Sequence, residues 1–269
     1  MATNKAASTP AATKPSITKI IVVHGDKGGV GKSMVTMAVT DLLMAKGEKV
    51  AIIETDTTNP DVSRMFKSNV PTVQTNVRSE DGWMEVMDFV MKNPGFTFIM
   101  NTPAGIGESM KSDMESFVSF LKEHLVSFEM DLMWVMNTQH DSVNLLNKAY
   151  QAYGQFFSRL LVVPNLHWAG GDNSKYGPFV LWHESPLKAQ IEHKGGKTIY
   201  FPGLHIRVVA KLFDPEKIMP FSDAVDAVVG EALDIGHSER WKLKQWLKDV
   251  QAAFEPVLTS SPSPEPQAA

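Results

Sequence analysis

The residues of this 269-residue chain that are best suited to chemistry form one glycine-rich run, Asp26–Ser33, with the sequence DKGGVGKS. Its glycines lack a Cβ, so the backbone N–H groups beside them can curl around the oxygens of a phosphate. Lys32 is placed to bridge the β- and γ-phosphates of a nucleotide, and the hydroxyl of Ser33 is placed to bind Mg²⁺. The nucleotide-binding residues predicted from this run are Gly28, Gly29, Val30, Gly31, Lys32, Ser33 and Met34.

The sequence on either side of the run supports this prediction. Ile17–His24 (ITKIIVVH) is a β-rich apolar stretch, and Gly25 then turns the chain. After the run, Gly31–Ala45 carries apolar residues at helical spacing and is followed by Gly47, a residue that commonly ends helices. The N-terminus of that helix adds partial positive charge beside the phosphates. The alternative, a chance glycine-rich turn, is disfavoured by the strand before the run and the helix after it.

Short apolar runs alternate with longer amphipathic stretches along the chain. The predicted strands are Ile17–His24, Lys49–Glu54, Phe96–Asn101, Asp131–Met136, Phe156–Pro164 and Lys197–Phe201. The predicted helices are Gly31–Ala45, Trp83–Met91, Glu108–Val126, Ser142–Gly154, Ser222–Leu233 and Ser238–Phe254. This alternation predicts an α/β fold, a mostly parallel sheet with helices on both faces. Ligands of such sheets bind beyond the carboxyl ends of the strands.

The composition excludes several classes of function. With 26 basic and 30 acidic residues the net charge is −4, which argues against coating nucleic acid over the whole surface. The chain has no cysteine, so disulfides, cysteine zinc sites, iron–sulfur clusters and thiol catalysis are excluded. We expect residues 1–16 to be a disordered leader, 17–258 one domain, and 259–269 a disordered tail. No signal peptide or transmembrane run is found, which predicts a cytoplasmic protein.

A second lysine, Lys27, lies inside the run, and Asp26 stands where simpler phosphate loops begin with glycine. The stretch KGGVGKS with this extra lysine resembles the deviant Walker A motif of the ParA/MinD family of P-loop ATPases, which includes plasmid-partition, division-site and related plasmid-encoded proteins. The resemblance implies that ATP is the ligand and that two subunits sandwich the nucleotide, with Lys27 reaching the partner's phosphates. A carboxylate at Asp26 costs electrostatic energy beside a triphosphate unless it points away.

Two acidic residues, Glu54 and Asp56, follow the second predicted strand. The ParA/MinD family carries an acidic-x-Asp pair at this strand end. The resemblance therefore implies that Asp56 positions the attacking water and that Glu54 lies near the Mg²⁺ shell. As an alternative, both acids cap a turn at the end of the strand. The catalytic residues implied in this way are Lys27, Lys32 and Asp56.

The third predicted strand ends in Asn101, followed by TPAG, where the family pattern is Asp-Thr-Pro-x-Gly. An amide can accept a hydrogen bond from a Mg²⁺-bound water, but it supplies no charge. Either Glu54 and Asp56 compensate and hydrolysis is slow, or the protein binds nucleotide with little turnover. We favour slow hydrolysis, because positioning and the remaining charges carry most of phosphoryl-transfer catalysis. The implied metal site consists of Ser33, Glu54, Asp56 and Asn101.

Two single-residue matches extend the resemblance toward the C-terminus. Asn165 stands where the family places an adenine-contacting asparagine, and Pro202 matches a proline that borders the base. Each residue could equally be an ordinary loop cap. With these matches the resemblance covers Lys19 to Leu233.

The stretch Ser238–Phe254 predicts a strongly amphipathic helix. Its apolar face consists of Leu243, Trp246, Leu247, Val250 and Phe254. A basic row at the edge of that face consists of Arg240, Lys244 and Lys248. We favour packing of the apolar face on the sheet with solvated lysines, ahead of contact with non-specific DNA. Contact with a membrane is less favoured, because a membrane-binding helix would more naturally end the chain.

These features lead to three competing functions. The favoured one is an ATP-dependent homodimeric switch that binds DNA or a protein partner and is released by hydrolysis; the resemblance implies a setting in plasmid or mobile-element maintenance, partition or conjugative transfer. The second is a nucleotide-gated binding module with little hydrolysis. The third is a metabolic P-loop enzyme that acts on a small molecule, which no acceptor-site motif supports.

Overall fold

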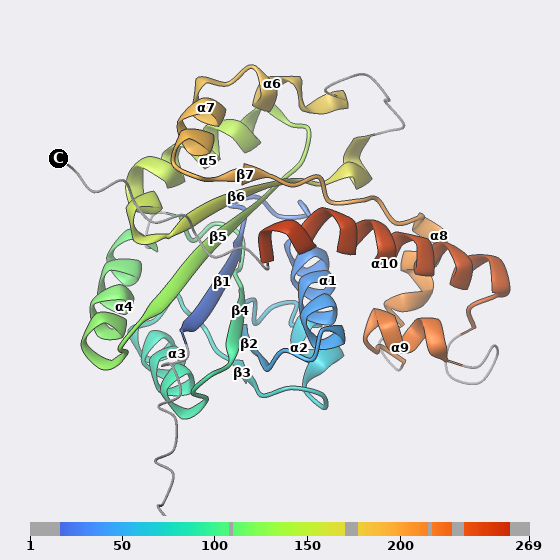
Figure 1. The fold of residues 1–269 in the computed structure, drawn as a ribbon, viewed down its shortest axis with the longest axis horizontal. Helices are drawn as coiled ribbons and strands as arrows, with labels where there is room; N and C mark the ends of the chain where they lie inside the picture. Colours follow the sequence, from blue (N-terminus) through green and yellow to red (C-terminus); the bar gives the residue numbers. More distant parts are fainter. Residues whose placement is uncertain (1–16, 108–109, 170–176, 215–216, 228–233, 259–269) are drawn as a thin grey trace, which may run out of the picture.

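The computed structural model describes residues 17–107, 110–169, 177–214, 217–227 and 234–258. Within these ranges seven parallel strands form one sheet between two layers of helices (Figure 1). The strands are β1 (Thr18–His24), β2 (Val50–Glu54), β3 (Thr72–Gln74), β4 (Thr97–Asn101), β5 (Phe128–Met136), β6 (Arg159–Pro164) and β7 (Lys197–Thr198). The predicted α/β class with a parallel sheet is confirmed.

The central strands are apolar throughout because both faces of the sheet are covered. Successive side chains of a strand point to opposite faces. In β1, Ile21 and Val23 pack into one core, and Ile20 and Val22 pack into the other. A continuous apolar run such as IIVV is therefore what a strand buried on both sides requires.

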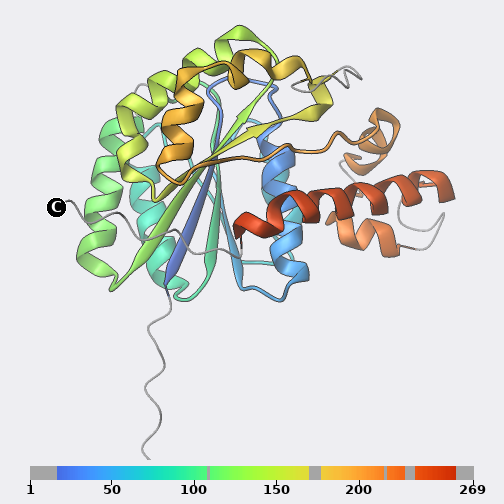
Figure 2. The ribbon, with the colours of Figure 1, turned by 45° about the horizontal axis from the view of Figure 1, so that its top comes forward.

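The helices divide between the two faces of the sheet (Figures 1 and 2). One core is covered by α1 (Lys32–Ala45), α2 (Asp61–Phe66), α8 (Ile206–Leu212), α9 (Phe221–Asp226) and α10 (His237–Leu258). The other is covered by α3 (Glu80–Lys92), α4 (Met110–His124), α5 (His140–Tyr153), α6 (Val180–His183) and α7 (Pro186–His193).

The strand order places a ligand-binding edge beside β1. The order is β3-β2-β4-β1-β5-β6-β7, so β1 lies between β4 and β5 and the chain changes direction across the sheet there. In open α/β sheets the crevice at this switch point is where ligands bind. The glycine-rich run follows β1 directly and therefore lies at this position.

The long elements agree in position with the sequence prediction and the short ones do not. The strand predicted over Phe156–Pro164 begins only at Arg159, because Phe156 ends a 3-10 helix. Among the α-helices and strands of the described ranges, five were not predicted, namely α2, β3, α6, α7 and α8, and each has eight residues or fewer. Such segments are too short for a helical or strand period to stand out. The strand predicted over Lys197–Phe201 is wrong beyond Thr198, where a single bridge from Asn165 to Phe201 replaces a ladder. The helix predicted over Ser222–Leu233 ends at Asp226, and residues 228–233 lie outside the described ranges.

The amphipathic C-terminal helix α10 lies across α1, α8 and α9 (Figure 2). Its apolar face packs into the core. Its buried side chains include Leu243, Trp246, Val250 and Phe254, whereas Lys244 and Lys248 are exposed. The apolar face is therefore covered, as the favoured interpretation predicted, and the lysines face solvent. In the part of the chain that the structure describes, no helix has the length and apolar character needed to cross a membrane.

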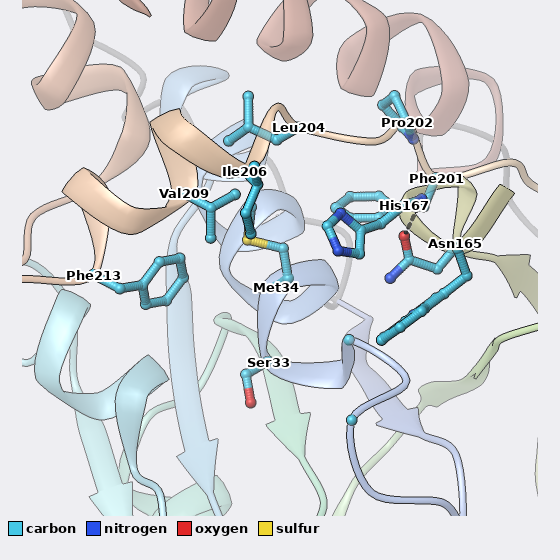
Figure 3. Close-up of a pocket in the computed structure, with 13 residues that line it drawn as sticks. Ser33, Met34, Asn165, His167, Phe201, Pro202, Leu204, Ile206, Val209 and Phe213 are labelled. Carbon is cyan, nitrogen blue, oxygen red and sulfur yellow. Dashed lines mark hydrogen bonds between the residues drawn. The ribbon is translucent and has the colours of Figure 1, made fainter. Parts of the chain in front are cut away.

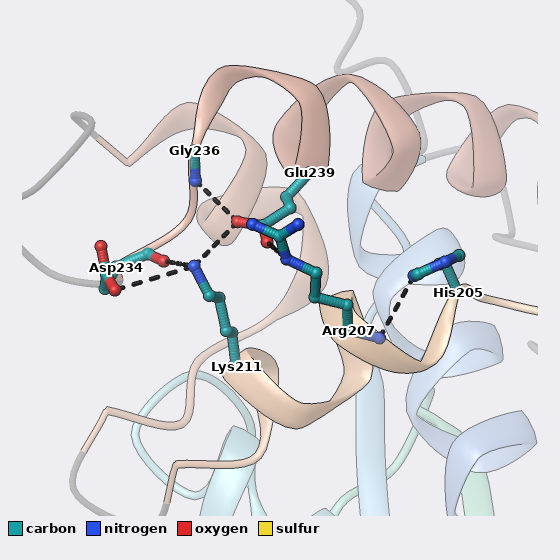
Figure 4. Close-up of polar contacts among 6 residues, drawn as sticks. All are labelled: His205, Arg207, Lys211, Asp234, Gly236 and Glu239. Atoms are coloured by element: carbon teal, nitrogen blue, oxygen red, sulfur yellow. Dashed lines mark hydrogen bonds and ion pairs between the residues drawn. The ribbon is translucent and has the colours of Figure 1, made fainter.

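A buried carboxylate ties the start of α10 to α8 (Figure 4). Glu239 Oε2 accepts hydrogen bonds from Lys211 Nζ and from the backbone N–H of Gly236, both at 2.9 Å. Its other oxygen lies 2.7 Å from Arg207 Nε. Arg207 and Lys211 are four residues apart and so lie on one side of α8. These contacts fix α8, whose other side faces the cavity described below.

Candidate functional site

The loop after β1 has the backbone that a phosphate cradle needs. A Cβ on Gly25 would lie 2.5 Å from the carbonyl oxygen of Val135, so only glycine fits where the loop leaves the sheet. Gly29 and Gly31 have φ values of 75° and 102°, which side-chain-bearing residues rarely adopt. Gly31 is also the N-cap of α1 and has no side chain to cap the helix, so the N-terminus of the helix is open toward an anion.

Lys32 is buried inside this loop. Its Nζ donates hydrogen bonds to the carbonyl oxygens of Gly25 at 3.0 Å and Lys27 at 3.1 Å. Burial lowers the pKa of Lys32, while the carboxylates of Asp56 and Asp26 oppose that shift. The ammonium is thus held by weak neutral acceptors at the place where a phosphate would offer a charged one.

Asp26 is directed toward the loop that follows β4. Its Oδ1 accepts a hydrogen bond of 3.3 Å from the N–H of Gly107, and its carbonyl oxygen accepts one of 3.0 Å from Gly105. No non-glycine residue in the described ranges has a positive φ, so Asp26 needs no strained backbone to replace the usual glycine. Its carboxylate therefore fastens the loop after β1 to the loop after β4.

Lys27 points out of the loop toward the start of α5. Its Nζ donates a hydrogen bond to Gln139 Oε1 and lies 3.0 Å from Asp141 Oδ2. The hydrogen bond from Lys27 lowers the pKa of the Asp141 carboxyl. The two lysines of the motif thus differ in position, since Lys32 is inside its own loop and Lys27 is at the surface with 32% of its side chain exposed.

Glu54 and Asn101 meet at the carboxyl ends of adjacent strands. They are paired in the ladder between β2 and β4, and Asn101 Nδ2 donates a hydrogen bond of 2.9 Å to Glu54 Oε1. The same amide nitrogen lies 3.4 Å from Ser33 Oγ. On its other side, Asn101 Oδ1 accepts a hydrogen bond of 3.2 Å from Thr36 Oγ1 of α1. The structure thus brings Ser33, Glu54 and Asn101 together.

Burial raises the pKa of Glu54 to about 7, although hydrogen bonds from Asn101 and from the backbone N–H groups of Asp56 and Ser63 oppose the shift. Its Oε2 is buried and makes no hydrogen bond of 3.5 Å or less among the described residues. A buried polar atom of this kind costs free energy unless a ligand or water satisfies it.

These oxygen donors fit Mg²⁺. Nowhere in the described ranges do three or more His, Asp or Glu side chains gather as a metal cage. Mg²⁺ is usually held by one or two protein groups together with substrate phosphates and waters, so a cage is not required. The Ser33 hydroxyl and the Glu54 carboxylate would hold such an ion beside the phosphates, and the ion would neutralise phosphate charge there.

Asp56 has a structural task in addition to the predicted catalytic one. Its Oδ1 accepts hydrogen bonds of 3.2 Å from the N–H groups of Thr58 and Asn59, which is the turn-capping arrangement proposed as the alternative. The carboxylate is still close enough to oppose the lowering of the Lys32 pKa. Its role with the attacking water and Mg²⁺ stays a prediction.

An apolar cavity of about 340 Å³ adjoins the loop (Figure 3). It is lined by Gly29, Gly31, Ser33, Met34, Asn165, His167, Trp168, Phe201, Pro202, Leu204, Ile206, Val209 and Phe213. Asn165 and Pro202, the two residues predicted to border the base, both line it. So does Met34. The size and apolar lining suit an aromatic base next to the phosphate loop.

Polar groups of the two predicted base residues already have partners. Asn165 Nδ2 donates to the carbonyl oxygen of Val30 at 2.9 Å, and its Oδ1 accepts from the N–H of His167 at 3.0 Å. The carbonyl oxygen of Pro202 accepts a hydrogen bond of 2.8 Å from Trp246 Nε1 of α10. Asn165 therefore holds the phosphate loop in place, and its contact with adenine stays a prediction.

Several residues of the site were not found from the sequence. Thr36, Gln139 and Asp141 contact predicted site residues but belong to no motif. The α8 side chains Ile206 and Val209 lie three residues apart, but the helix is too short for this spacing to have been noticed. His24, at the end of β1, is fully buried under the loop, and burial lowers its pKa to about 3.

The strand, glycine-rich loop and uncapped helix at the switch point of a parallel sheet define a P-loop nucleotide-binding protein. The family model described as ParA, NUBPL iron-transfer P-loop NTPase, matches residues 16–106. Protein MobD of Acidithiobacillus ferrooxidans is 32% identical over 239 residues, which cover 89% of this chain and 97% of MobD. The chain therefore belongs to the ParA/MinD family of P-loop NTPases.

Other similarities are shorter or concern the fold alone. The cytosolic Fe-S cluster assembly factor CFD1 of Yarrowia lipolytica is 35% identical over 89 residues, 32% of this chain and 30% of CFD1. The cell division protein MinD of Aquifex aeolicus superposes with a TM-score of 0.50 and 14% identity, covering 91% of this chain and 99% of MinD. A nucleotide-binding protein of Archaeoglobus fulgidus, solved with ADP, gives a TM-score of 0.50 at 18% identity, with 70% and 82% of the two chains covered.

Proposed function

We propose that this chain is an ATP-dependent dimerising switch, an ATPase with slow turnover that acts in plasmid or mobile-element maintenance, partition or conjugative transfer. Membership of the ParA/MinD family supports the class. The observation that carries the proposal is the different placement of the two lysines of the loop.

Lys32 lies within its own loop, 3.0 Å from the carbonyl oxygen of Gly25, and is placed for the β- and γ-phosphates of the same subunit. Lys27 contacts Asp141 and Gln139 at the rim and is turned away from its own loop. A partly exposed ammonium at the mouth of the site is available to the phosphates of a second subunit. The contact with Asp141 is a surface ion pair, which is weak because water screens it and is easily exchanged for a phosphate.

The remaining site residues have consistent roles in this proposal. The loop N–H groups and the N-terminus of α1 hold the phosphates, and Asp56 positions the water that attacks the γ-phosphate. Ser33 and Glu54 would hold Mg²⁺, which when bound would neutralise charge on the phosphates. The base lies in the apolar cavity between Asn165 and α8. Slow turnover follows because the amide of Asn101 leaves the metal site with fewer negative charges.

The exposed side of α10 is the candidate contact for a partner. Lys244 and Lys248 lie one turn apart, with Lys242 also exposed, whereas the apolar face is packed into the core. Because the apolar face is packed into the core, α10 presents positive charge but no apolar surface that could insert into lipid. This favours contact with non-specific DNA over contact with a membrane. An unidentified protein partner remains compatible with the same surface. Weaker DNA binding of a Lys244→Ala, Lys248→Ala variant, with a lower salt dependence, would support the DNA contact.

Two other functions are less well supported. A binding module with little turnover is favoured only by the replacement at Asn101, and phosphate release comparable to that of ordinary ATPases of this family would exclude it. A role in iron–sulfur assembly is named for CFD1, but clusters are held mainly by cysteine thiolates and this chain has none.

The proposal is tested by the molar mass of the protein in light scattering with ATP, a non-hydrolysable ATP analogue, ADP or no nucleotide. We expect a dimer only with ATP or its analogue. Lys27→Ala should remain monomeric while it still binds nucleotide through Lys32. Lys92→Ala, which removes an exposed lysine paired with Asp88 on α3, is the matched control and should dimerise normally. Normal dimerisation of Lys27→Ala would contradict the proposal.

A further inference from the structure

The apolar cavity beside the phosphate loop contains an imidazole whose nitrogens are not bonded to any described residue. His167 lines the cavity, and its ring lies between α8 and Asn165 (Figure 3). The ring stands edge-to-face against Trp168, with the two ring centroids 5.3 Å apart. A polar group directed into an apolar cavity is the kind of group that orients a ligand there.

The backbone around His167 is held by several contacts, so the ring has a defined place at the cavity. The N–H of His167 donates to Asn165 Oδ1 at 3.0 Å, and the N–H of Trp168 donates to the carbonyl oxygen of Asn165 at 3.1 Å. A Cβ on Gly203 would lie 3.3 Å from the Cα of His167, so glycine lets these two segments pack closely. These contacts hold the short 3-10 helix Leu166–Ala169 against the cavity.

The other polar side chains that line the cavity are either engaged or of a single polarity. Asn165 uses both of its amide atoms in bonds within the protein. Ser33 is at the phosphate end, 3.4 Å from Asn101 Nδ2, and the indole N–H of Trp168 can only donate. The rest of the lining is apolar and suits the faces of a planar base. The edge of the base is therefore left to His167.

An imidazole suits either purine at that edge. The neutral ring has one donor and one acceptor nitrogen, and the proton can be on either of them. Adenine carries an amino donor at C6, whereas guanine carries a carbonyl acceptor there. A site with a fixed donor or acceptor rejects the wrong partner by about 10⁴-fold, but a ring that can exchange the two roles does not.

We propose that His167 reads the C6 edge of the base, and that the chain consequently takes guanine nucleotides as well as adenine nucleotides. The inference rests on the nucleotide binding in the proposed function and widens its ligand from ATP to the purine nucleotides. It does not depend on dimerisation, since the cavity and the ring belong to one subunit.

The first test compares three diphosphates on the unmodified protein by calorimetry at pH 8, where a free imidazole is neutral. The affinities for ADP and GDP should lie within about tenfold of each other. Purine riboside diphosphate has only hydrogen at C6 and cannot form the bond there, so it should bind about tenfold more weakly than ADP and GDP. The inference is overturned if GDP binds more than about 100-fold more weakly than ADP, or if the purine riboside compound binds as tightly as ADP.

Two variants of opposite polarity test His167 itself. His167→Arg offers only donors and should shift the ratio of affinities toward GDP by about tenfold, because arginine pairs with O6 and N7 of guanine. His167→Glu offers acceptors and should shift the ratio toward ADP by about the same factor, through the amino group of adenine. A change in charge that acts on both nucleotides alike cancels in this ratio. His193→Arg, at an exposed position on α7 over the other core, is the matched control and should leave the ratio unchanged.

A residue that only supports the fold would not give shifts of opposite sign. Shifts in the same direction, or an unchanged ratio in both variants, would overturn the role of His167. Binding of inorganic tripolyphosphate shows whether the phosphate loop of each variant is intact. If it is not, His167→Phe is used instead; this variant keeps a ring but no polar atom, and it should weaken ADP and GDP equally by about tenfold. Unchanged affinities in His167→Phe would also contradict the inference.

Failure of the proposed function has a different signature. A protein that binds ADP and GDP with the expected ratio but never dimerises would refute the switch and leave this inference standing. A protein that dimerises with ATP and excludes guanine nucleotides would refute this inference alone. A protein that binds no nucleotide would refute both.

Discussion

The candidate site has a phosphate end and a base end, which are built in different ways. At the phosphate end, polar groups such as Lys32, Glu54 and Asn101 are buried at strand ends or in the loop between β1 and α1. At the base end, the apolar cavity is closed by α8, a seven-residue helix that shares its core with α10 and is also joined to it by ion pairs with Glu239 (Figures 3 and 4).

This difference assigns the two ends separate tasks. Groups fixed on the edge of a parallel sheet move little, so the phosphate end is suited to hold charge in one geometry. A helix of only seven residues is more easily displaced than the end of a central strand, so the base end is where nucleotide entry would change the structure. Asn165 connects the two ends, because its side chain lines the cavity and also bonds to the carbonyl oxygen of Val30 in the loop.

The largest effect should come from Lys32→Ala. This change removes the lysine whose Nζ lies inside the phosphate loop. Charge-assisted hydrogen bonds to phosphate contribute about 1.5–3 kcal/mol each. We expect affinity for ADP and for inorganic tripolyphosphate to fall together by about 100-fold. Calorimetry measures both. A lower affinity for ADP with an unchanged affinity for tripolyphosphate would show that Lys32 does not bind the phosphates.

Val209→Asp should affect only the base end. The new carboxylate would face an apolar cavity, where an unpaired charge is costly to bury. ADP affinity should fall by about tenfold or more, whereas tripolyphosphate affinity should not change. Met84→Ala on α3, which alters an exposed apolar side chain away from the cavity, is the control. Equal loss for both ligands would mean that the two ends are not separable.

Asn165→Ala distinguishes a loop clamp from a base contact. As a clamp, it stabilises the carbonyl of Val30, and loss of that buried hydrogen bond should weaken ADP and tripolyphosphate alike, by about tenfold. As a base contact alone, it would affect ADP and leave tripolyphosphate unchanged. The same titrations therefore show to which end Asn165 belongs.

His24 makes the stability of the phosphate end depend on pH. Thr102 Oγ1 donates to the carbonyl of Val23, so His24 Nδ1 donates to that hydroxyl whether or not the ring is charged, and it is burial of the ring that disfavours the charged form. Its pKa is about 3 when folded against 6.5 when free, so only the unfolded chain takes up the proton between these values. The free energy of unfolding should therefore fall as pH drops below 6.5, by about 1.4 kcal/mol per pH unit from this residue.

His24→Gln should remove that slope and keep a polar side chain. Urea titrations of both proteins at pH 7 and pH 5 provide the measurement. If the free energy of unfolding falls equally in the two proteins between pH 7 and pH 5, groups other than His24 control the acid sensitivity.

The smallest effect should come from Glu239→Gln. It removes the charge that holds Arg207 and Lys211, while the amide can still accept from Gly236. Because the hydrogen bond from Gly236 and the bond from Lys211 lower the pKa of Glu239, its stabilising effect is present at neutral pH and lost in acid as the carboxylate is protonated. We expect a modest drop in Tm and in ADP affinity, with tripolyphosphate unaffected. Glu192→Gln, which breaks the ion pair with Lys188 on α7, is the matched control.

The two ends also differ in how far the sequence could predict them. The loop and its flanking elements are contiguous, so Lys32 and Ser33 could be placed from spacing alone. Glu54 and Asn101 were assigned through the family resemblance, and the parallel sheet accounts for their lying at the same edge. The orientation of Asp26 toward Gly107 and the bond from Asn165 to Val30 join segments far apart in the chain. A pattern within a short stretch of sequence cannot reveal contacts between residues so far apart in the chain. The helix α8, which lines the cavity, was not predicted because seven residues are too few for a helical pattern of apolar residues to be recognised.

The central claim, that Lys27 acts on the partner's nucleotide, is tested most directly by mixing two inactive proteins. Lys27→Ala keeps its own Lys32 but has no lysine to offer, and Lys32→Ala cannot hold ATP but still offers Lys27. The mixed pair then contains one complete site. Light scattering with a non-hydrolysable ATP analogue should find dimers in the mixture and in neither protein alone. A mixture that stays monomeric while the unmodified protein dimerises, or dimers of Lys27→Ala alone, would contradict the account.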